Sequence, residues 1–178
     1  TWCSACVRGR GVAAPHRKVK PADTLPVIQL DYTFPLGNDL VKAVSAVDSL
    51  TGYGMSTMIR FKGASDSFAI GAISQLLEDL GYAEVVIQTD EEASLVDLAR
   101  AVIKKWQGRA HLRMTPRESS QSNGRVERFH GTSKALARTL VVGLEEGYQR
   151  TISSQSSLVT WSIRHAAWLY VRFQIHQD

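Results

Sequence analysis

Cysteine is scarce in this sequence, and long apolar runs are absent. The two cysteines among 178 residues, Cys3 and Cys6, lie too close together to cross-link a core. A disulfide-stabilised scaffold is therefore excluded, and a reducing intracellular setting fits better. No stretch is apolar over the length of a bilayer, so we expect no membrane partner. Neither an initiator Met nor a signal-like start is present, and we expect a fragment of a longer protein.

Acidic residues are scarce in two parts of the chain. The net charge is only +4, but residues 1–20 carry five bases and no acid, and residues 104–138 carry nine bases against two acids. Such clustering favours an anionic partner, and nucleic acid is the natural candidate. The alternative is that these bases only solvate a tail and a surface.

Composition and apolar periodicity predict one α/β domain. With 44% apolar and 21% charged residues the chain is ordinary for a globular protein, and its length suffices for one well-buried core. Strand alternation and helical spacing predict the order strand, strand, strand, helix, strand, helix, strand, helix. The expected ranges are 25–34, 40–48, 55–61, 66–80, 83–90, 94–106, 110–115 and a helix from Asn123, then a glycine-bearing break over 143–157 and an aromatic helix over 158–173.

Three acids occupy unusual positions in these elements. Alternation places Asp31 in mid-strand on the more polar face, and Asp90 ends a β-branched run, where α/β folds place ligands. Glu127 lies one turn inside the helix that Asn123 would cap. At about 100° per residue, its face also carries Lys134, and solvated ion pairs are the alternative for such a face. The opposite face is the expected core stripe of Val126, Phe129, Leu136, Leu140 and Leu144. A fourth acid, Asp48, is assigned to a turn.

The three acids and their neighbours resemble the D-D-E motif of retroviral and retrotransposon integrases. The matching segments are Gln-Leu-Asp-Tyr-Thr around Asp31, Gln-Thr-Asp ending at Asp90, and Gln-Ser-Asn-Gly-Arg-Val-Glu-Arg-Phe around Glu127, with 36 residues between the last two acids. The resemblance covers roughly residues 25–145, and the Cys-x-x-Cys pair extends it upstream. It implies an α/β fold of the ribonuclease-H-like class, with a mixed five-stranded sheet flanked by helices.

The resemblance also implies three parts of the chain. Residues 1–24 would be the remnant of an N-terminal zinc-binding region plus a basic linker. Residues 25–147 would be the integrase catalytic core, and residues 148–178 a C-terminal helical extension that packs on the core. Zinc at Cys3 and Cys6 would require two further ligands, and two free thiols are the alternative.

The activity implied by the resemblance is metal-dependent processing of DNA 3′ ends and their transfer into target DNA. Two Mg²⁺ or Mn²⁺ ions would serve as cofactors, because such hard cations prefer carboxylate oxygens. Asp31 would bridge both ions, while Asp90 and Glu127 would complete one site each. No covalent nucleophile would be needed.

The partners implied by the resemblance are DNA, as element ends and target, and further copies of the chain in a dimer or tetramer. Lys134 matches a lysine that integrases use to contact the DNA end, and Asn123, Arg128 and Arg138 are further candidates for DNA contact. Helix capping is the alternative for Asn123. The aromatic helix over 158–173 is interpreted as a packing or dimer-contact surface. The protein would act in the nucleus on host DNA after synthesis in the cytoplasm.

The sequence departs from the integrase pattern after the second acid. Many integrases carry Asn-Gly there, whereas Glu91 and Glu92 follow Asp90 in this chain. We interpret both glutamates as the first turn of a helix, whose dipole favours acids. Two alternative functions stay open: a ribonuclease-H-like transposase or nuclease with the same three acids, and a catalytically silent DNA-binding or assembly module from a decayed element.

Overall fold

The computed structural model describes residues 25–36, 41–115 and 124–173 of the chain. Within these ranges, no helix combines the length and the apolarity needed to cross a membrane. The predictions made for Cys3, Cys6 and Asn123 lie outside the described residues.

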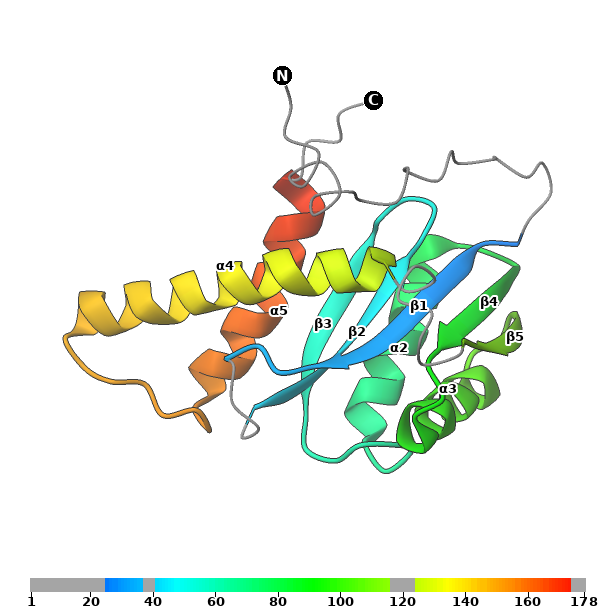
Figure 1. Cartoon of the computed structure of the whole chain (residues 1–178), viewed down its shortest axis with the longest axis horizontal. Helices are drawn as coiled ribbons and strands as arrows, with labels where there is room; N and C mark the ends of the chain where they lie inside the picture. Colours follow the sequence, from blue (N-terminus) through cyan, green and yellow to red (C-terminus); the bar gives the residue numbers. More distant parts are fainter. Residues whose placement is uncertain (1–24, 37–40, 116–123, 174–178) are drawn as a thin grey trace, which may run out of the picture.

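Five strands form one mixed sheet in the order β3-β2-β1-β4-β5 (Figure 1). The strand β1 (Val27–Thr33) pairs antiparallel with β2 (Lys42–Asp48), and β2 pairs antiparallel with β3 (Gly54–Ile59). On its other side β1 pairs parallel with β4 (Glu84–Thr89), which pairs parallel with β5 (Arg109–Met114). The predicted strands are confirmed, and β1 is the central strand.

Alternation along β1 separates its side chains between the two faces of the sheet, as predicted. Ile28, Leu30 and Tyr32 are buried in the main hydrophobic core. Gln29 and Asp31 lie on the opposite face, where both contact the first turns of α4. The central strand therefore supplies apolar side chains to one layer and polar side chains to the other.

The helices α2 (Ser67–Leu80) and α3 (Ala93–Lys105) cover the apolar face of β1. Asp66 caps α2, because its carboxylate accepts a hydrogen bond from an N–H of the first turn at 3.0 Å. Gly81 ends α2 with a φ of 68°, a left-handed conformation that favours glycine. Both helices were predicted, but Phe68, which the apolar spacing of the helix predicted over 66–80 places on its inner side, is 54% exposed. Its ring instead lies beneath an arginine guanidinium of the C-terminal helix.

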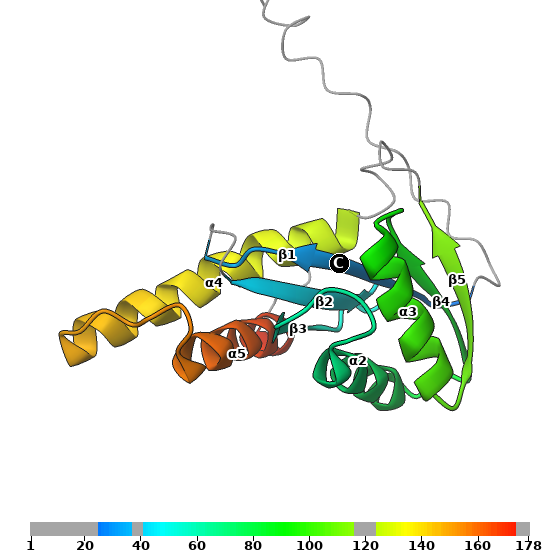
Figure 2. The ribbon, with the colours of Figure 1, turned by 90° about the horizontal axis from the view of Figure 1, so that it is seen from below.

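The helices α4 (Gly124–Tyr148) and α5 (Ser157–Phe173) pack against the other face of the sheet and against each other (Figures 1 and 2). The last turns of α4 extend beyond the sheet, whereas α5 packs against its first and middle turns. The break predicted over 143–157 is wrong in part, since α4 continues through Gly143 and Gly147. Packing of the preceding turns of α4 against α5 stabilises the helix despite the two glycines.

This sheet order, with helices on both faces, is the ribonuclease-H-like fold, and the predicted fold class is confirmed. The turn assigned to Asp48 is confirmed as well. Its two carboxylate oxygens accept hydrogen bonds from the N–H groups of Leu50 and Thr51 at 3.0 and 3.1 Å, and the Tyr82 hydroxyl donates to it at 3.1 Å. Asp48 is fully buried and structural.

Candidate active site

Asp31 lies close to the carboxyl end of the central strand, on the face that α4 covers. It pairs with Ser45 of β2, and β4 is bonded to the other edge of β1. Its side chain is 30% exposed, so the carboxylate is largely withdrawn from water but still reachable from outside. A strand paired on both edges holds this carboxylate in a fixed position.

Asp90 follows the last residue of β4 and begins the connection to α3. Its Oδ1 accepts a hydrogen bond from the Glu92 N–H at 3.0 Å, the local turn in which Asp bonds the backbone two residues ahead. Because β1 and β4 run parallel and adjacent, their carboxyl ends meet at one end of the sheet. Asp31 and Asp90 therefore belong to the same end of the molecule.

Glu127 lies in the first turn of α4 and is exposed to solvent. The start of this helix is attached to the sheet by Gln29, whose Oε1 accepts a hydrogen bond from the Val126 N–H at 3.1 Å. Gln29 is only 6% exposed and lies two residues before Asp31 on the same face of β1. The bond therefore brings the neighbour of Glu127 to the strand that carries Asp31. Gln29 was not singled out from the sequence, although its place on the polar face before Asp31 was a usable signal.

Burial and the nearby acids change the ionisation of Asp31. Burial raises the pKa of Asp31 from 3.8 to about 6, and the charge of Asp90 and then that of Glu127 act in the same direction, with a smaller contribution from Glu92. A backbone hydrogen bond at Tyr32 opposes the shift. Carboxylates that hinder each other's ionisation form a site that a cation would stabilise.

His130 is a further residue of this site that the sequence reading missed. It is 6% exposed, and its Nδ1 lies 3.5 Å from the Asp31 Oδ2. Burial, and then the Lys134 ammonium, lower the pKa of His130 to about 4, so the ring is neutral at pH 7. Its contact with Asp31 is accordingly a long polar contact rather than an ion pair. His130 lies one turn beyond Glu127, on the buried side of α4. Its contact with Asp31 depends on how α4 packs against β1, which the sequence alone does not reveal.

The chemistry of these side chains fits a hard divalent cation, because all the candidate ligands are carboxylate oxygens. Asp31, Asp90 and Glu127 are the residues that would hold it. Their arrangement is open: across the part of the chain that the structure describes, no three His, Cys, Asp or Glu side chains are close enough together to ligate one ion. The acids are thus electrostatic neighbours that do not yet form a closed cage.

The predicted DNA-contacting bases on α4 have different surroundings. Arg128 is exposed, and Lys134 is half-buried and close enough to His130 to influence its pKa. Arg138 donates a hydrogen bond through its Nε to the Pro35 carbonyl at 3.1 Å. This guanidinium therefore also attaches α4 to the segment after β1.

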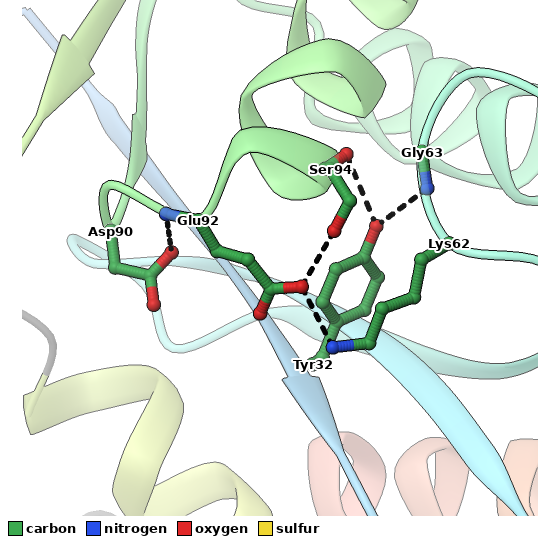
Figure 3. A network of polar contacts seen from close by, with 6 residues as sticks. All are labelled: Tyr32, Lys62, Gly63, Asp90, Glu92 and Ser94. Carbon is green, nitrogen blue, oxygen red and sulfur yellow. Dashed lines mark hydrogen bonds and ion pairs between the residues drawn. The ribbon is translucent and has the colours of Figure 1, made fainter.

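The two glutamates after Asp90 do not form the first turn of α3, contrary to the prediction. The helix begins at Ala93, and its first turn contains no acid. Glu92 precedes the helix and is bonded to Lys62 and Ser94 (Figure 3). Its negative charge is neutralised by a side chain distant in sequence, a pairing that local patterns do not reveal.

Comparisons with known proteins support the fold. No family model matches this chain, and no curated protein matches it. The chain is similar in structure to a chain in the cryo-EM structure of the simian T-cell lymphotropic virus intasome in complex with PP2A regulatory subunit B56 gamma, with a TM-score of 0.60 and 18% sequence identity. The match covers 85% of this chain and 50% of that chain, so this chain spans about half the length of that relative. The likeness shows the integrase-like core fold.

Proposed function

On the premise that this chain has an integrase-like catalytic core fold, we propose that it is the catalytic core of a retroelement integrase. It would trim the 3′ ends of element DNA and transfer them into target DNA. The observation that carries the proposal is geometric: Asp31 and Asp90 come to one end of the sheet because β1 and β4 are parallel neighbours, and Gln29 of β1 attaches the turn of α4 that carries Glu127. Nuclear action on host DNA is part of the same proposal.

Phosphodiester transfer requires charge stabilisation at an attacking and a leaving oxygen on opposite sides of phosphorus. Two Mg²⁺ or Mn²⁺ ions, when bound, would supply positive charge at both oxygens. Asp31 would hold its ligand oxygens on the rigid central strand. Asp90 is oriented by the Glu92 N–H, and Glu127 is placed by the helix that Gln29 attaches to the sheet. Each acid therefore has its own positioning contact.

DNA would approach along the exposed side of α4. Lys134 is the main candidate for a phosphate contact, and Arg128, which is exposed, is a second candidate. Positive side chains beside an acidic site attract the phosphate backbone, while bound cations would offset its repulsion by the carboxylates. Asn123 stays a candidate contact as part of this proposal.

Self-association is the second component of the proposed function. The outer side of α5 carries a stack of Trp161, His165 and Trp168, with ring centroids 4.6 and 5.4 Å apart, and both tryptophans are 47% exposed. A groove of about 690 Å³ lies between this stack and the start of β3. Exposed aromatic side chains of this kind are typical of protein interfaces. We assign them to contacts between copies of this chain.

The activity is tested with Mn²⁺ and a branched oligonucleotide that resembles a half-integrated product. We expect the wild-type chain to resolve the branch, and Asp31→Asn and Glu127→Gln to be inactive. The control is Asp97→Asn on the exposed side of α3, which should retain activity. Inactivity of the wild type, matched by Asp31→Asn, would favour the silent assembly module. Activity that depends on the ends of a cut-and-paste element would favour a transposase.

A further inference from the structure

Lys62, in the segment after β3, forms an ion pair with Glu92 just before α3. The Lys62 Nζ lies 2.7 Å from the Glu92 Oε1 and 4.6 Å from the centroid of the Tyr32 ring. The Ser94 hydroxyl donates to the same carboxylate oxygen at 2.6 Å. Glu92 thus offers Lys62 an anionic oxygen acceptor of the kind that a DNA backbone also offers.

The ion pair is adjacent to two of the three acids. The N–H of Glu92 donates to the carboxylate of Asp90, and Tyr32 follows Asp31 on β1 with its side chain on the opposite face of the sheet. The charge of Glu92 also contributes to the raised pKa of Asp31. In Figure 3, Glu92 lies between Asp90 and Lys62, and the start of α4 lies on the side of Asp90. Lys62 therefore lies beyond Glu92 as seen from Asp90 and from the start of α4.

Hydrogen bonds of Tyr32 hold the loop next to Lys62, while the ion pair between Lys62 and Glu92 is partly exposed to solvent. The Tyr32 hydroxyl accepts a hydrogen bond from the Gly63 N–H at 2.9 Å and donates to the Ser94 carbonyl at 3.3 Å, which joins the loop after β3 to the start of α3. The side chains of Lys62 and Glu92 are 33% and 34% exposed. An ion pair with this exposure is weak and screened by salt, so replacing one partner costs little.

We propose that Lys62 binds a phosphate of the DNA strand that lies across Asp31 and Asp90, and that Glu92 holds this lysine in the DNA-free protein. The inference rests on the proposed function and adds a phosphate-binding position to it. Lys134 holds the strand on the α4 side of the acids, and Lys62 holds it on the opposite side. Glu92 keeps the hydroxyl of Ser94 as its partner after the exchange.

The simplest alternative is a permanent internal ion pair that never contacts DNA. The two possibilities differ in the double variant Lys62→Ala/Glu92→Gln, which deletes one cation and one anion and so preserves the net charge. A permanent pair contributes no net charge, and its removal leaves DNA affinity unchanged. An exchangeable pair contributes one phosphate contact, and its removal weakens binding.

The experiment measures fluorescence anisotropy of a labelled DNA duplex over a series of salt concentrations. The matched control is Arg100→Ala/Asp97→Asn, which deletes an ion pair of α3 whose atoms are 3.6 Å apart and whose side chains are 65% and 60% exposed. We expect the Lys62→Ala/Glu92→Gln variant to bind about fivefold more weakly, with a slope of log affinity against log salt reduced by about 0.9. The control should bind like the wild type.

Thermal unfolding checks that each variant is folded, and Lys62→Gln/Glu92→Gln, which retains longer side chains, replaces any variant that is not. Wild-type affinity and slope in the folded Lys62 variant would overturn the inference while leaving the proposed function intact. Absence of salt-dependent DNA binding by the wild type would overturn both, and the two failures are distinguishable in the same titration.

Discussion

Among single residues, Asp31 is the acid of the candidate site whose pKa is raised, by burial first and then by the charges of Asp90, Glu127 and Glu92. An acid whose pKa is higher in the folded than in the unfolded chain binds more protons when folded. Without a bound cation, the free energy of unfolding therefore decreases as the pH rises from 3.8 through about 6, and the full penalty is present above pH 6. His130 has the opposite effect, because its pKa is lowered from 6.5 to about 4 in the folded chain. Its contribution to the free energy of unfolding is fully present above pH 6.5 and is lost as the pH falls from 6.5 through about 4.

Asp31→Asn should stabilise the cation-free protein at pH 7.5. We expect a gain in the free energy of unfolding of about 2 kcal/mol, a value reduced for the 30% exposure of the side chain. Because His130 affects both proteins, the relevant quantity is the difference between variant and wild type, measured by urea unfolding in EDTA. This difference should vanish near pH 4. Equal stability at pH 7.5 would contradict the raised pKa of Asp31 in the folded chain.

Two bases on the same side of α4 should respond differently to truncation. Lys134→Ala is expected to weaken DNA binding and to reduce the salt slope by about 1, without loss of stability. Arg138→Ala should in addition lower the free energy of unfolding by about 1 kcal/mol, because its hydrogen bond to the Pro35 carbonyl is lost. Anisotropy and urea unfolding separate the two effects. Lys104→Ala, an exposed lysine on α3, is the control and should change neither quantity.

At the scale of elements, the site depends on how α4 is attached to β1. The helix reaches the sheet through the bond from the Val126 N–H to Gln29, the contact between His130 and Asp31, and the packing of Phe129. Only the first of these is a short hydrogen bond to a buried side chain. Gln29 accordingly anchors the turn of α4 that carries Glu127.

Gln29→Ala should therefore impair both stability and activity. The buried N–H of Val126 would lose its acceptor, which costs about 2 kcal/mol. Branch resolution with Mn²⁺ should fall more than this loss of stability explains, because Glu127 is no longer held opposite Asp31. The matched control is Gln75→Ala, an exposed glutamine bonded to Asp79, which should change stability by less than about 0.5 kcal/mol. Full activity of Gln29→Ala would refute this role.

Local sequence patterns were sufficient to predict the helices and strands. They failed where contacts with residues distant in sequence determine the exposure of a side chain or the end of a helix. Alternation identified the strands, and Asp66 and Gly81 marked both ends of α2, since such signals depend only on neighbours in sequence. The apolar spacing that placed Phe68 inward could not anticipate a cation from α5 over its ring. Gly143 and Gly147 suggested a helix break because the packing of α4 against α5 is a tertiary effect.

The candidate site was predictable in its residue types but not in its supporting contacts. Asp31 and Asp90 were recognisable because one lies on a polar strand face and the other ends a buried strand. The partners of these acids, His130 and Glu92, became visible only in the folded chain. Lys62 was hidden for the same reason, because 30 residues separate it from the glutamate that it contacts.

At the scale of the whole molecule, the outer face of α5 is the candidate interface between copies. Trp168 is central to it, stacked on His165 on one side and covered by the Arg172 guanidinium at 5.4 Å. Replacing this ring with an acid would place a charge in an apolar contact, which is costly. The intramolecular core would be little affected, because the side chain is 47% exposed.

Trp168→Glu should convert a dimeric or larger wild-type assembly into monomers. The mass is measured by size-exclusion chromatography with light scattering over a range of protein concentrations. Tyr148→Glu serves as the control, since this aromatic residue is 70% exposed at the far end of α4 and should leave the mass unchanged. A wild type that is monomeric at every concentration, or a Trp168→Glu variant with the wild-type mass, would exclude α5 as the interface.

The position of Asp31 on the middle strand of the sheet has a consequence for how such a site can adapt. The backbone of Asp31 is paired with Ser45 of β2 inside the sheet, whereas Glu127 is carried by a helix that packs on the sheet through side chains. Binding of a wider or narrower substrate would therefore require a shift of α4 and not of the sheet. The same holds for a closer approach of the three carboxylates. The strand side of the candidate site would stay in place, and the helix side would account for the adjustment.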